Sequence, residues 1–451
     1  MSGLRALAEF AACFDLAAAP KEVVQEGRRQ LLDTVGVIIG AASVPEVRAL
    51  AAIEARDPGP ATFLGQDGWA AAEAAALVNA TAGVWLDYDS GQRASGSHPA
   101  VHVVPAALAI AEEVGASGAD LLSAVIVGCE VGARMGAAAG RLHPLLSPHG
   151  SWPVLGAAAA AARLLGFDGA QLAATLEVAS SLTLLTSTGL HTAGANGRHL
   201  QAGLGAQRGI VAARLQAAGF TGDPEGCQQV FGRLVTPTFN TRRLAIGLGR
   251  QWEFLRGYYK PYACARVTHA AIDALLEIRR QRAALGIHAE DVVAIEVVTF
   301  AAAAALADPH PTSELAARFS LPYILAATWV RGDAGPASFA TTIRRHPAVR
   351  RLAERVRLRE DPEYTALTPE YRPATVSVQF RDGTSLTVER LNASGEPDDP
   401  LLPLWLEEKF DGLVAPVLGR ERAQHLRQQL LQVEQVPAVA ELTALTIPPR
   451  P

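Results

Sequence analysis

Runs of alanine, leucine and valine, each about one helix long and separated by glycine or aspartate, fill the chain from its start to about residue 263. Apolar residues repeated over such lengths predict helices, and abundant alanine and glycine let helix backbones approach closely. This pattern predicts a compact core of many helices. Its clearest expected boundaries are capping boxes at Ser117 with Asp120 and at Asp168 with Gln171, and glycine stops at Gly115 and Gly166.

The later part of the chain has a mixed pattern. β-Branched residues and an Asp-Gly turn predict a strand over 292–300 and a hairpin with strands over 374–380 and 384–389. Helices are expected over 314–329, 348–356 and 404–433. Because 451 residues exceed what one hydrophobic core usually holds, we expect a smaller α+β lobe inserted between two parts of a helical one.

Charge and cysteine content exclude several classes of partner. The chain has 40 Lys and Arg against 45 Asp and Glu, without a basic block that would bind a nucleic acid backbone. Its 4 cysteines show no metal-ligand spacing, which predicts reduced thiols and no metal site. The start of the chain lacks a signal-peptide pattern, and glycine and acidic residues interrupt apolar stretches such as 121–131 before they reach membrane-spanning length. We therefore expect a cytoplasmic protein with no membrane partner.

Two histidines stand directly before predicted helix starts. His98 precedes Pro99 and follows the acidic segment that contains Asp87 and Asp89, and His149 precedes a strongly helical alanine run. Helix amino termini attract anions, and an imidazole exchanges protons near neutral pH. The simpler interpretation is that each histidine lies in a polar loop that caps a helix. Two histidines before helix starts in one chain nevertheless favour an acid–base and anion site.

Two cations and a phenol extend this candidate site. Arg198 lies in a glycine-rich segment over 194–205 that lacks the GxGxxG spacing of a dinucleotide loop, so we interpret it as a carboxylate clamp. Lys260, one of only three lysines, has aromatic neighbours that favour burial. Tyr323 starts a predicted helix and is a possible hydroxyl donor, although a core tyrosine is the commoner outcome.

Six ordered segments carry a resemblance to a known family. They are DTVGVIIGAA, LDYDSGQ with SHPAVHVVPAALAIAE, HGSWPVLGAAAAAARLLG, GRHLQAGLGAQRG, YKPYACARVTHAAIDA and RFSLPYILAA. The chain resembles the MmgE/PrpD superfamily, which includes 2-methylcitrate dehydratase and cis-aconitate decarboxylase. The resemblance implies a mainly α fold with a large all-helical domain built from both chain ends, over 1–263 and 401–451, and a smaller α+β lid domain with a β-hairpin over 264–400. It also implies a homodimer whose pocket works without metal or organic cofactor.

The resemblance also implies roles for particular residues. By matching motifs, the catalytic residues would be Asp87, His98, His149, Lys260 and Tyr323.

A second group would bind substrate: Arg198, His199, Gln201, Arg266 and His269. Some positions depart from the usual family motifs. The DxDDT-like run is DYDSG here, the usual lysine is Arg198, and Gln201 replaces a histidine that His199 carries two positions earlier. A guanidinium keeps the charge but is a poor proton donor, so a proton-donating step needs another group.

The leading hypothesis is a cofactor-independent lyase, dehydratase-like or decarboxylase-like, that moves a proton next to a carboxylate of a small di- or tricarboxylic acid. One histidine would remove the proton α to a carboxylate while Arg198 and Lys260 hold that carboxylate and neutralise the charge that builds up on it. His98 and His149 on opposite faces of the substrate could act as base and acid. Two opposed bases would favour an epimerase or isomerase, whereas one base with a leaving-group acid would favour dehydration.

Two further alternatives remain. Gly91 and Gly96 leave space for a larger or amino-bearing acid, as in a specialised biosynthetic enzyme. The altered motif positions are also compatible with a catalytically inactive dimeric binding protein.

Overall fold

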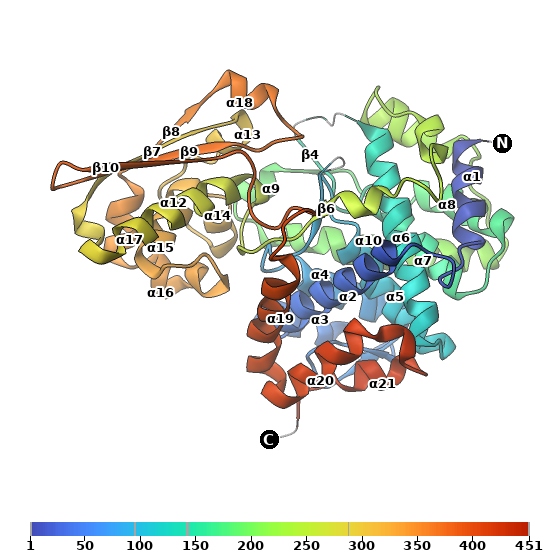
Figure 1. Ribbon diagram of the computed structural model, residues 1–451. Coiled ribbons are helices and arrows are strands. Elements are labelled where there is room, and N and C mark those ends of the chain that lie inside the picture. Colours follow the sequence, from blue (N-terminus) through green and yellow to red (C-terminus); the bar gives the residue numbers. More distant parts are fainter. Residues whose placement is uncertain (1, 94–95, 141–142, 144, 287, 450–451) are drawn as a thin grey trace.

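The computed structural model describes residues 2–93, 96–140, 143, 145–286 and 288–449 of the 451-residue chain. Its larger lobe is helical, as predicted, and holds the blue to green part of the chain (Figure 1). The helices of this part are α1 (Gly3–Ala12), α2 (Lys21–Ala41), α3 (Pro45–Glu54), α4 (Ala72–Gly83), α5 (Ala100–Val114), α6 (Gly118–Ala139), α7 (Pro153–Leu164), α8 (Gly169–Ser180), α9 (Gly189–Thr192), α10 (Leu200–Ala217) and α11 (Gly226–Gln229).

The predicted helix boundaries are confirmed. Capping boxes form at the start of α6, from Ser117 and Asp120, and at the start of α8, from Asp168 and Gln171. Gly115 ends α5 in the left-handed conformation at φ 67°, a backbone geometry that glycine adopts without strain. Local sequence therefore sets where these helices begin and end.

The core of the larger lobe depends on close helix contacts. Helices α6 and α7 pack against each other. They meet at Gly128 and Gly156, where a Cβ built on Gly156 would lie 2.6 Å from the carbonyl oxygen of Gly128. That distance is shorter than any ordinary contact, so a side chain at this crossing would push the helices apart.

We expect Gly156→Ala to lower the free energy of unfolding by about 1–3 kcal/mol, because overpacking a close crossing displaces backbone. The matched control is Gly412→Ala, an exposed helical site where a new Cβ meets nothing within 4 Å. The control should leave stability unchanged or raise it by up to about 1 kcal/mol, since alanine favours helix. Urea denaturation measures both; equal effects of the two substitutions would refute the close crossing.

The smaller lobe is an α+β unit that follows the first helical part. It contains α12 (His269–Arg282), β7 (Val292–Thr299), α13 (Ala301–Ala304), α14 (Glu314–Arg318), α15 (Leu321–Arg331), α16 (Thr341–Arg344), α17 (Pro347–Ala353), β8 (Val356–Glu360), α18 (Pro362–Ala366), β9 (Ala374–Phe380) and β10 (Ser385–Arg390). The strands lie in the order β10-β9-β7-β8. Strands β9 and β10 form the predicted hairpin, with Gly383 at φ 83° in its turn.

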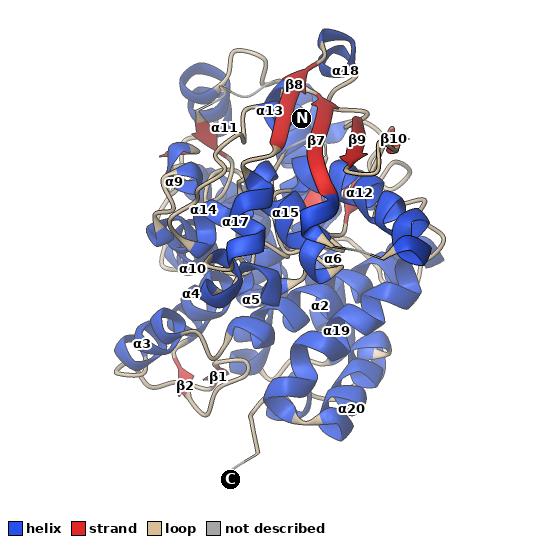
Figure 2. Ribbon diagram, turned by 90° about the vertical axis from the view of Figure 1, so that its left-hand side faces the viewer, coloured by secondary structure: helices blue, strands red, loops and turns tan. Residues whose placement is uncertain are grey.

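Helices and sheet of this lobe form two layers. Helix α12 packs on β9 and β10, and α15 packs on β8. In Figures 1 and 2 these helices and α17 lie along one face of the sheet. The pair β7 and β8 is parallel, whereas β7 and β9 are antiparallel.

The chain then returns to the larger lobe. Helix α19 (Leu402–Leu418) packs against α2, and α20 (Arg420–Leu431) and α21 (Val439–Ala444) follow it (Figure 1). The sequence predicted one helical stretch over 404–433, but Gly419 divides it at φ 82°. The domain boundaries at 263/264 and 400/401 stay predictions.

Helix α6 differs from the sequence-based expectation. Its 22 residues are long and apolar enough to cross a membrane, although glycine and acidic residues were expected to interrupt it. The acidic Glu130 does not interrupt the helix, because Arg134 Nε donates to its carboxylate at 2.5 Å. In the fold, 94% of the apolar window of this helix is buried, which is typical of a core helix.

Short antiparallel ladders connect loops of the larger lobe. They are β1 (Ala61–Thr62) with β2 (Trp69–Ala70), β3 (Gly91–Gln92) with β6 (Gly257–Tyr258), and β4 (Leu146–Ser147) with β5 (Thr186–Ser187). The pairing of β3 with β6 places the acidic loop after α4 beside the segment that carries Lys260.

Candidate active site

Asp87 lies in a strained turn after α4. Its φ is 47°, in the left-handed region that non-glycine residues seldom adopt and that aspartate tolerates better than most. Its backbone N–H donates to the carbonyl of Val84 at 3.2 Å. Its own carbonyl accepts from Lys260 Nζ at 2.9 Å. The turn therefore directs the backbone of Asp87 toward the Lys260 segment.

The Asp87 carboxylate lies between two cations. Arg198 Nη2 donates to Oδ1 at 3.2 Å, and Lys260 Nζ lies 3.3 Å from Oδ2. Arg198 belongs to a short 3₁₀ helix, Asn196–His199, and Lys260 directly follows the β6 segment. Burial raises the pKa of Asp87, but the charges of Lys260 and Arg198 outweigh this effect and lower it. Asp87 is therefore a carboxylate at neutral pH.

His98 is oriented by a second buried acid. Its Nδ1 lies 2.7 Å from Asp89 Oδ2 and 2.8 Å from the carbonyl of Ser90. Burial raises the pKa of Asp89, but the opposing charges of His98 and Lys260 bring it below its ordinary value. Because Nδ1 is engaged, Nε2 is the ring nitrogen left to exchange a proton with a substrate.

His149 stacks directly on His98, with ring centroids 4.7 Å apart and planes 18° apart. Its Nε2 lies 3.4 Å from Arg198 Nη2, while its buried Nδ1 has no hydrogen-bond partner in the described part of the chain. Burial, reinforced by the charge of Arg198, brings the pKa of His149 well below its ordinary value. His149 is therefore a neutral imidazole with an uncommitted polar atom.

His102 holds this pair of histidines in place from behind. Its Nδ1 is 2.9 Å from the carbonyl of His98, and its Nε2 accepts from the backbone N–H of Gly150 at 3.2 Å. The first contact makes Nδ1 the protonated nitrogen, so the ring is neutral and both nitrogens are satisfied. His102 is a positioning residue that the sequence analysis did not select.

A buried ion pair from both ends of the chain supports the same loops. Lys409 Nζ on α19 donates to Asp33 Oδ1 on α2 at 2.6 Å, to the Tyr88 carbonyl at 2.7 Å and to the Lys260 carbonyl at 3.1 Å. The other oxygen of Asp33 accepts from the backbone N–H of Ser90 at 3.0 Å. One ammonium thus fixes the backbone beside Asp87 and beside Lys260.

Arg318 ties the smaller lobe to this site. Its Nη1 donates to the carbonyl of Leu86 at 2.7 Å and to that of Ala263 at 2.5 Å. The next residue, Phe319, lies with its ring 5.9 Å from the Arg198 guanidinium. The acid–histidine cluster therefore lies where the two lobes meet.

The structure does not bring every predicted site residue into this cluster. The Tyr323 hydroxyl donates to the Ser338 carbonyl at 2.6 Å inside the smaller lobe. His269 contacts Arg266 at 3.1 Å, and Arg266 pairs with Glu396 at 2.8 Å. These contacts give Arg266 and His269 structural partners next to the cluster.

The predicted residues His199 and Gln201 lie beside Arg198. The His199 ring packs against Trp85 at a tilt of 31°, with ring centroids 4.3 Å apart, and Gln201 accepts from Ser147 Oγ at 2.7 Å. Buried His199 Nδ1 and Gln201 Nε2 have no hydrogen-bond partner in the ranges that the structure describes. Such atoms in a native protein are available to a ligand or water.

Sequence reasoning missed the supporting residues Asp33, His102, Arg318 and Lys409. Asp33, His102 and Arg318 stand inside segments that carry the family resemblance, and Lys409 is one of only three lysines, but none of these signals indicated a supporting role. The described residues hold no group of three or more His, Cys, Asp and Glu arranged for a metal ion. What the cluster supplies is a proton-exchanging imidazole on an acid, a second neutral imidazole, and two fixed cations.

These features define a class: a mainly helical, two-lobed protein with a buried acid–base centre at the lobe junction. Residues 5–235 match the MmgE/PrpD N-terminal domain and residues 262–435 match the MmgE/PrpD C-terminal domain, so the chain belongs to the MmgE/PrpD family, as predicted.

Its relatives bear decarboxylase names. The cis-aconitate decarboxylase-like protein oryM of Aspergillus oryzae (strain ATCC 42149 / RIB 40) is 26% identical over 94% of this chain and 93% of the relative. The cis-aconitate decarboxylase of Aspergillus terreus (strain NIH 2624 / FGSC A1156) is 24% identical over 94% of this chain and 92% of the relative. The cis-aconitate decarboxylase of Homo sapiens is 26% identical over 84% of this chain and 80% of the relative. These names agree with the predicted lyase class.

Burial of imidazoles makes stability depend on pH. Burial lowers the pKa of His191 to about 3, and the Arg198 charge adds to this effect. The unfolded side chain has a pKa of about 6.5, so below that pH the unfolded state binds a proton that the folded state excludes. Stability from this group is therefore full above pH 6.5 and is lost as the pH falls.

We expect His191→Gln to make the fall of unfolding free energy between pH 6.5 and 5 less steep, by an amount that grows toward about 1.4 kcal/mol per pH unit at pH 5, the effect of one proton. Urea denaturation across this range measures the slope. The exposed His425→Gln is the matched control and should keep the slope of the unmodified protein. Equal slopes in both variants would contradict the assignment of a buried neutral His191.

Proposed function

We propose that this protein is a cofactor-independent lyase that transfers a proton next to a carboxylate of a small di- or tricarboxylic acid, with release of carbon dioxide as its overall reaction. The observation that carries the proposal is the convergence of Asp87, His98, His149, Arg198 and Lys260 in one buried cluster. The decarboxylase names of its relatives support the choice of carbon dioxide release over loss of water.

Arg198 and Lys260 are the groups that would hold substrate carboxylates. Both are buried, and each already contacts one oxygen of Asp87, so their positions are fixed before a substrate arrives. A guanidinium offers planar paired donors, whereas an ammonium acts as a point charge. Because Arg198 does not release a proton, it contributes binding and charge neutralisation, and the proton comes from elsewhere.

The proposed reaction conserves atoms and charge. The bond between a substrate carbon and its carboxylate breaks, carbon dioxide leaves, and the electron pair spreads toward a neighbouring carboxylate. The cations stabilise that charge. His98, held by Asp89 through Nδ1, gives a proton from Nε2 to the carbon, and solvent then restores the proton. One carbon dioxide leaves and one proton is taken up.

The stacking of His98 and His149 bears on the isomerase alternative. Epimerisation by two bases needs a substrate between them, yet the ring centroids are only 4.7 Å apart. A substrate carbon between two parallel rings needs roughly twice the van der Waals separation of about 3.5–4.0 Å. The arrangement therefore favours one proton-transferring imidazole, with His149 as its neutral neighbour.

We expect the purified protein, incubated in deuterated water with a panel of small unsaturated di- and tricarboxylic acids that includes cis-aconitate, to release carbon dioxide and incorporate one deuterium per turnover. His98→Asn, which removes the proton donor, should lower kcat by about 100-fold to 10,000-fold. The exposed His425→Asn is the matched control and should retain activity. Mass spectrometry of the product measures both effects.

Absence of carbon dioxide release across the panel would remove the decarboxylase proposal. Loss of water would favour the dehydratase alternative, and deuterium exchange with neither loss would favour an isomerase. No reaction in the unmodified protein, together with ligand affinity that His149→Ala leaves unaltered, would favour an inactive binding protein. The homodimer and the cytoplasmic location stay predictions.

A further inference from the structure

Gly91 leaves a space that a tyrosine side chain fills. Gly91 and Tyr258 face each other in the ladder of β3 with β6. A Cβ built on Gly91 would lie 2.5 Å from Cζ of Tyr258, and closer still to its hydroxyl oxygen. Any side chain at position 91 would therefore displace the phenol. The glycine in DYDSG, where related motifs have threonine, is what admits this hydroxyl group.

The Tyr258 ring extends the row of rings in the candidate active site. It meets the His98 ring edge-on, with centroids 6.4 Å apart and planes at 85°. His98 in turn stacks on His149. Tyr258 is buried, with 3% of its surface exposed. A buried phenol beside the proposed proton donor is in position to contact a substrate bound there.

Two guanidinium groups flank the Tyr258 ring. Arg266 lies 4.9 Å and Arg372 lies 5.3 Å from its centroid. Arg266 forms an ion pair with Glu396 at 2.8 Å, a carboxylate that it shares with Arg93. Arg372, just before β9 in the smaller lobe, forms no ion pair with a carboxylate among the described residues, although the charge of Glu396 acts on it from a distance. A half-buried guanidinium without a directly paired carboxylate in the described part of the chain is a ready partner for an anionic ligand.

We propose that the Tyr258 hydroxyl and the Arg372 guanidinium together bind a second carboxylate of the substrate, one that does not react. The Tyr258 O–H can donate to a carboxylate oxygen, and the Arg372 guanidinium, 5.3 Å from the centroid of the same ring, supplies the opposite charge. This pair would select acids with two or more carboxylates over monocarboxylates. The inference rests on the proposed function, because the reacting carboxylate is placed at Arg198 and Lys260.

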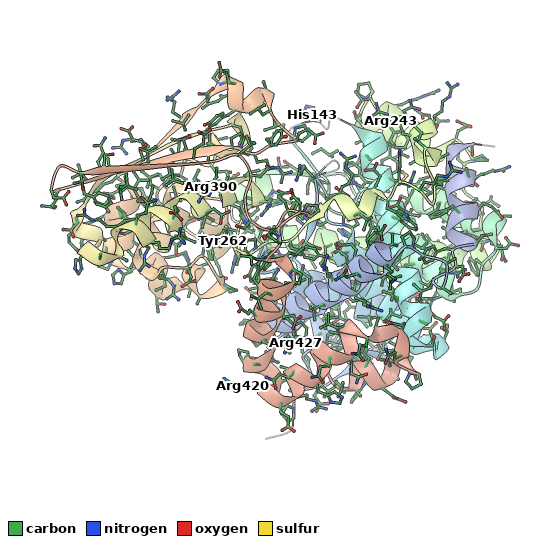
Figure 3. All side chains as sticks on the ribbon, in the orientation of Figure 1. His143, Arg243, Tyr262, Arg390, Arg420 and Arg427 are labelled. Carbon is green, nitrogen blue, oxygen red and sulfur yellow. The ribbon has the colours of Figure 1, made fainter. Side chains whose placement is uncertain are left out.

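The test compares Tyr258→Phe and Arg372→Gln with Tyr262→Phe. The control residue, labelled in Figure 3, lies on the same segment, but its hydroxyl donates to Asp273. Hydrogen bonds to charged groups correspond to about tenfold to a hundredfold in affinity. Tyr258→Phe and Arg372→Gln should raise KM for a dicarboxylate by this factor, with kcat changed only a few-fold, whereas Tyr262→Phe should leave both unchanged. Near-UV circular dichroism verifies folding of each variant.

A pair of substitutions separates the hydroxyl from the bulk of the ring. Tyr258→Ala removes both, and adding Gly91→Thr returns a hydroxyl to the vacated space without the clash. If the site needs a hydroxyl there, the double variant should regain part of the affinity lost in Tyr258→Ala. A purely structural role for the ring predicts no recovery.

Calorimetric binding of tricarballylate, a saturated tricarboxylate, makes the two proposals separable. If the unmodified protein turns over its substrate and KM is unchanged in both Tyr258→Phe and Arg372→Gln, the inference is overturned and the proposed function stays intact. Binding that weakens in both variants, in a protein without turnover, supports the second carboxylate site and removes the lyase proposal. A protein that neither binds nor turns over these acids overturns both.

Discussion

Lys260 and Arg198 are held inside this protein as cations because the carboxylate of Asp87 lies between them. An isolated buried charge is far too costly to persist, so each charge in the cluster depends on its neighbours. The same rule governs the Asp33–Lys409 pair, whose ammonium also binds the carbonyls beside Asp87 and Lys260. The active-site geometry is therefore one connected set of buried charges.

That connectivity explains which parts of the molecule could be predicted from sequence. Helix caps and the β9–β10 hairpin depend on residues a few positions apart, and they formed as expected. Histidines at helix openings and a rare lysine among aromatic residues also gave local signals. By contrast, Lys409 and Asp33 are 376 positions apart, and the hydroxyl of Tyr258 fits only because Gly91 faces it across a ladder. Such pairings follow from the fold and have no local pattern. For Tyr323 the local signal and the fold differ. A motif match predicted it in the site, but its hydroxyl donates a hydrogen bond to the carbonyl of Ser338.

The residues of the cluster differ in charge and in hydrogen-bond partners. Buried His149 is neutral and has a nitrogen without a hydrogen-bond partner among the described residues, while Asp89 contacts His98 at Nδ1. Arg198, where the usual family motif has lysine, keeps positive charge without offering a proton. The smaller lobe closes this arrangement through Arg318, which binds the carbonyls of Leu86 and Ala263. In the proposed mechanism, charge stabilisation and proton transfer thus belong to different side chains held by one network.

The most direct measurement is a crystal structure of the protein with bound tricarballylate. The account predicts one carboxylate within hydrogen-bond distance of both Arg198 and Lys260, and the adjacent carbon facing Nε2 of His98. A ligand bound away from these three residues, or a cluster whose side chains face separate regions of solvent, would contradict it.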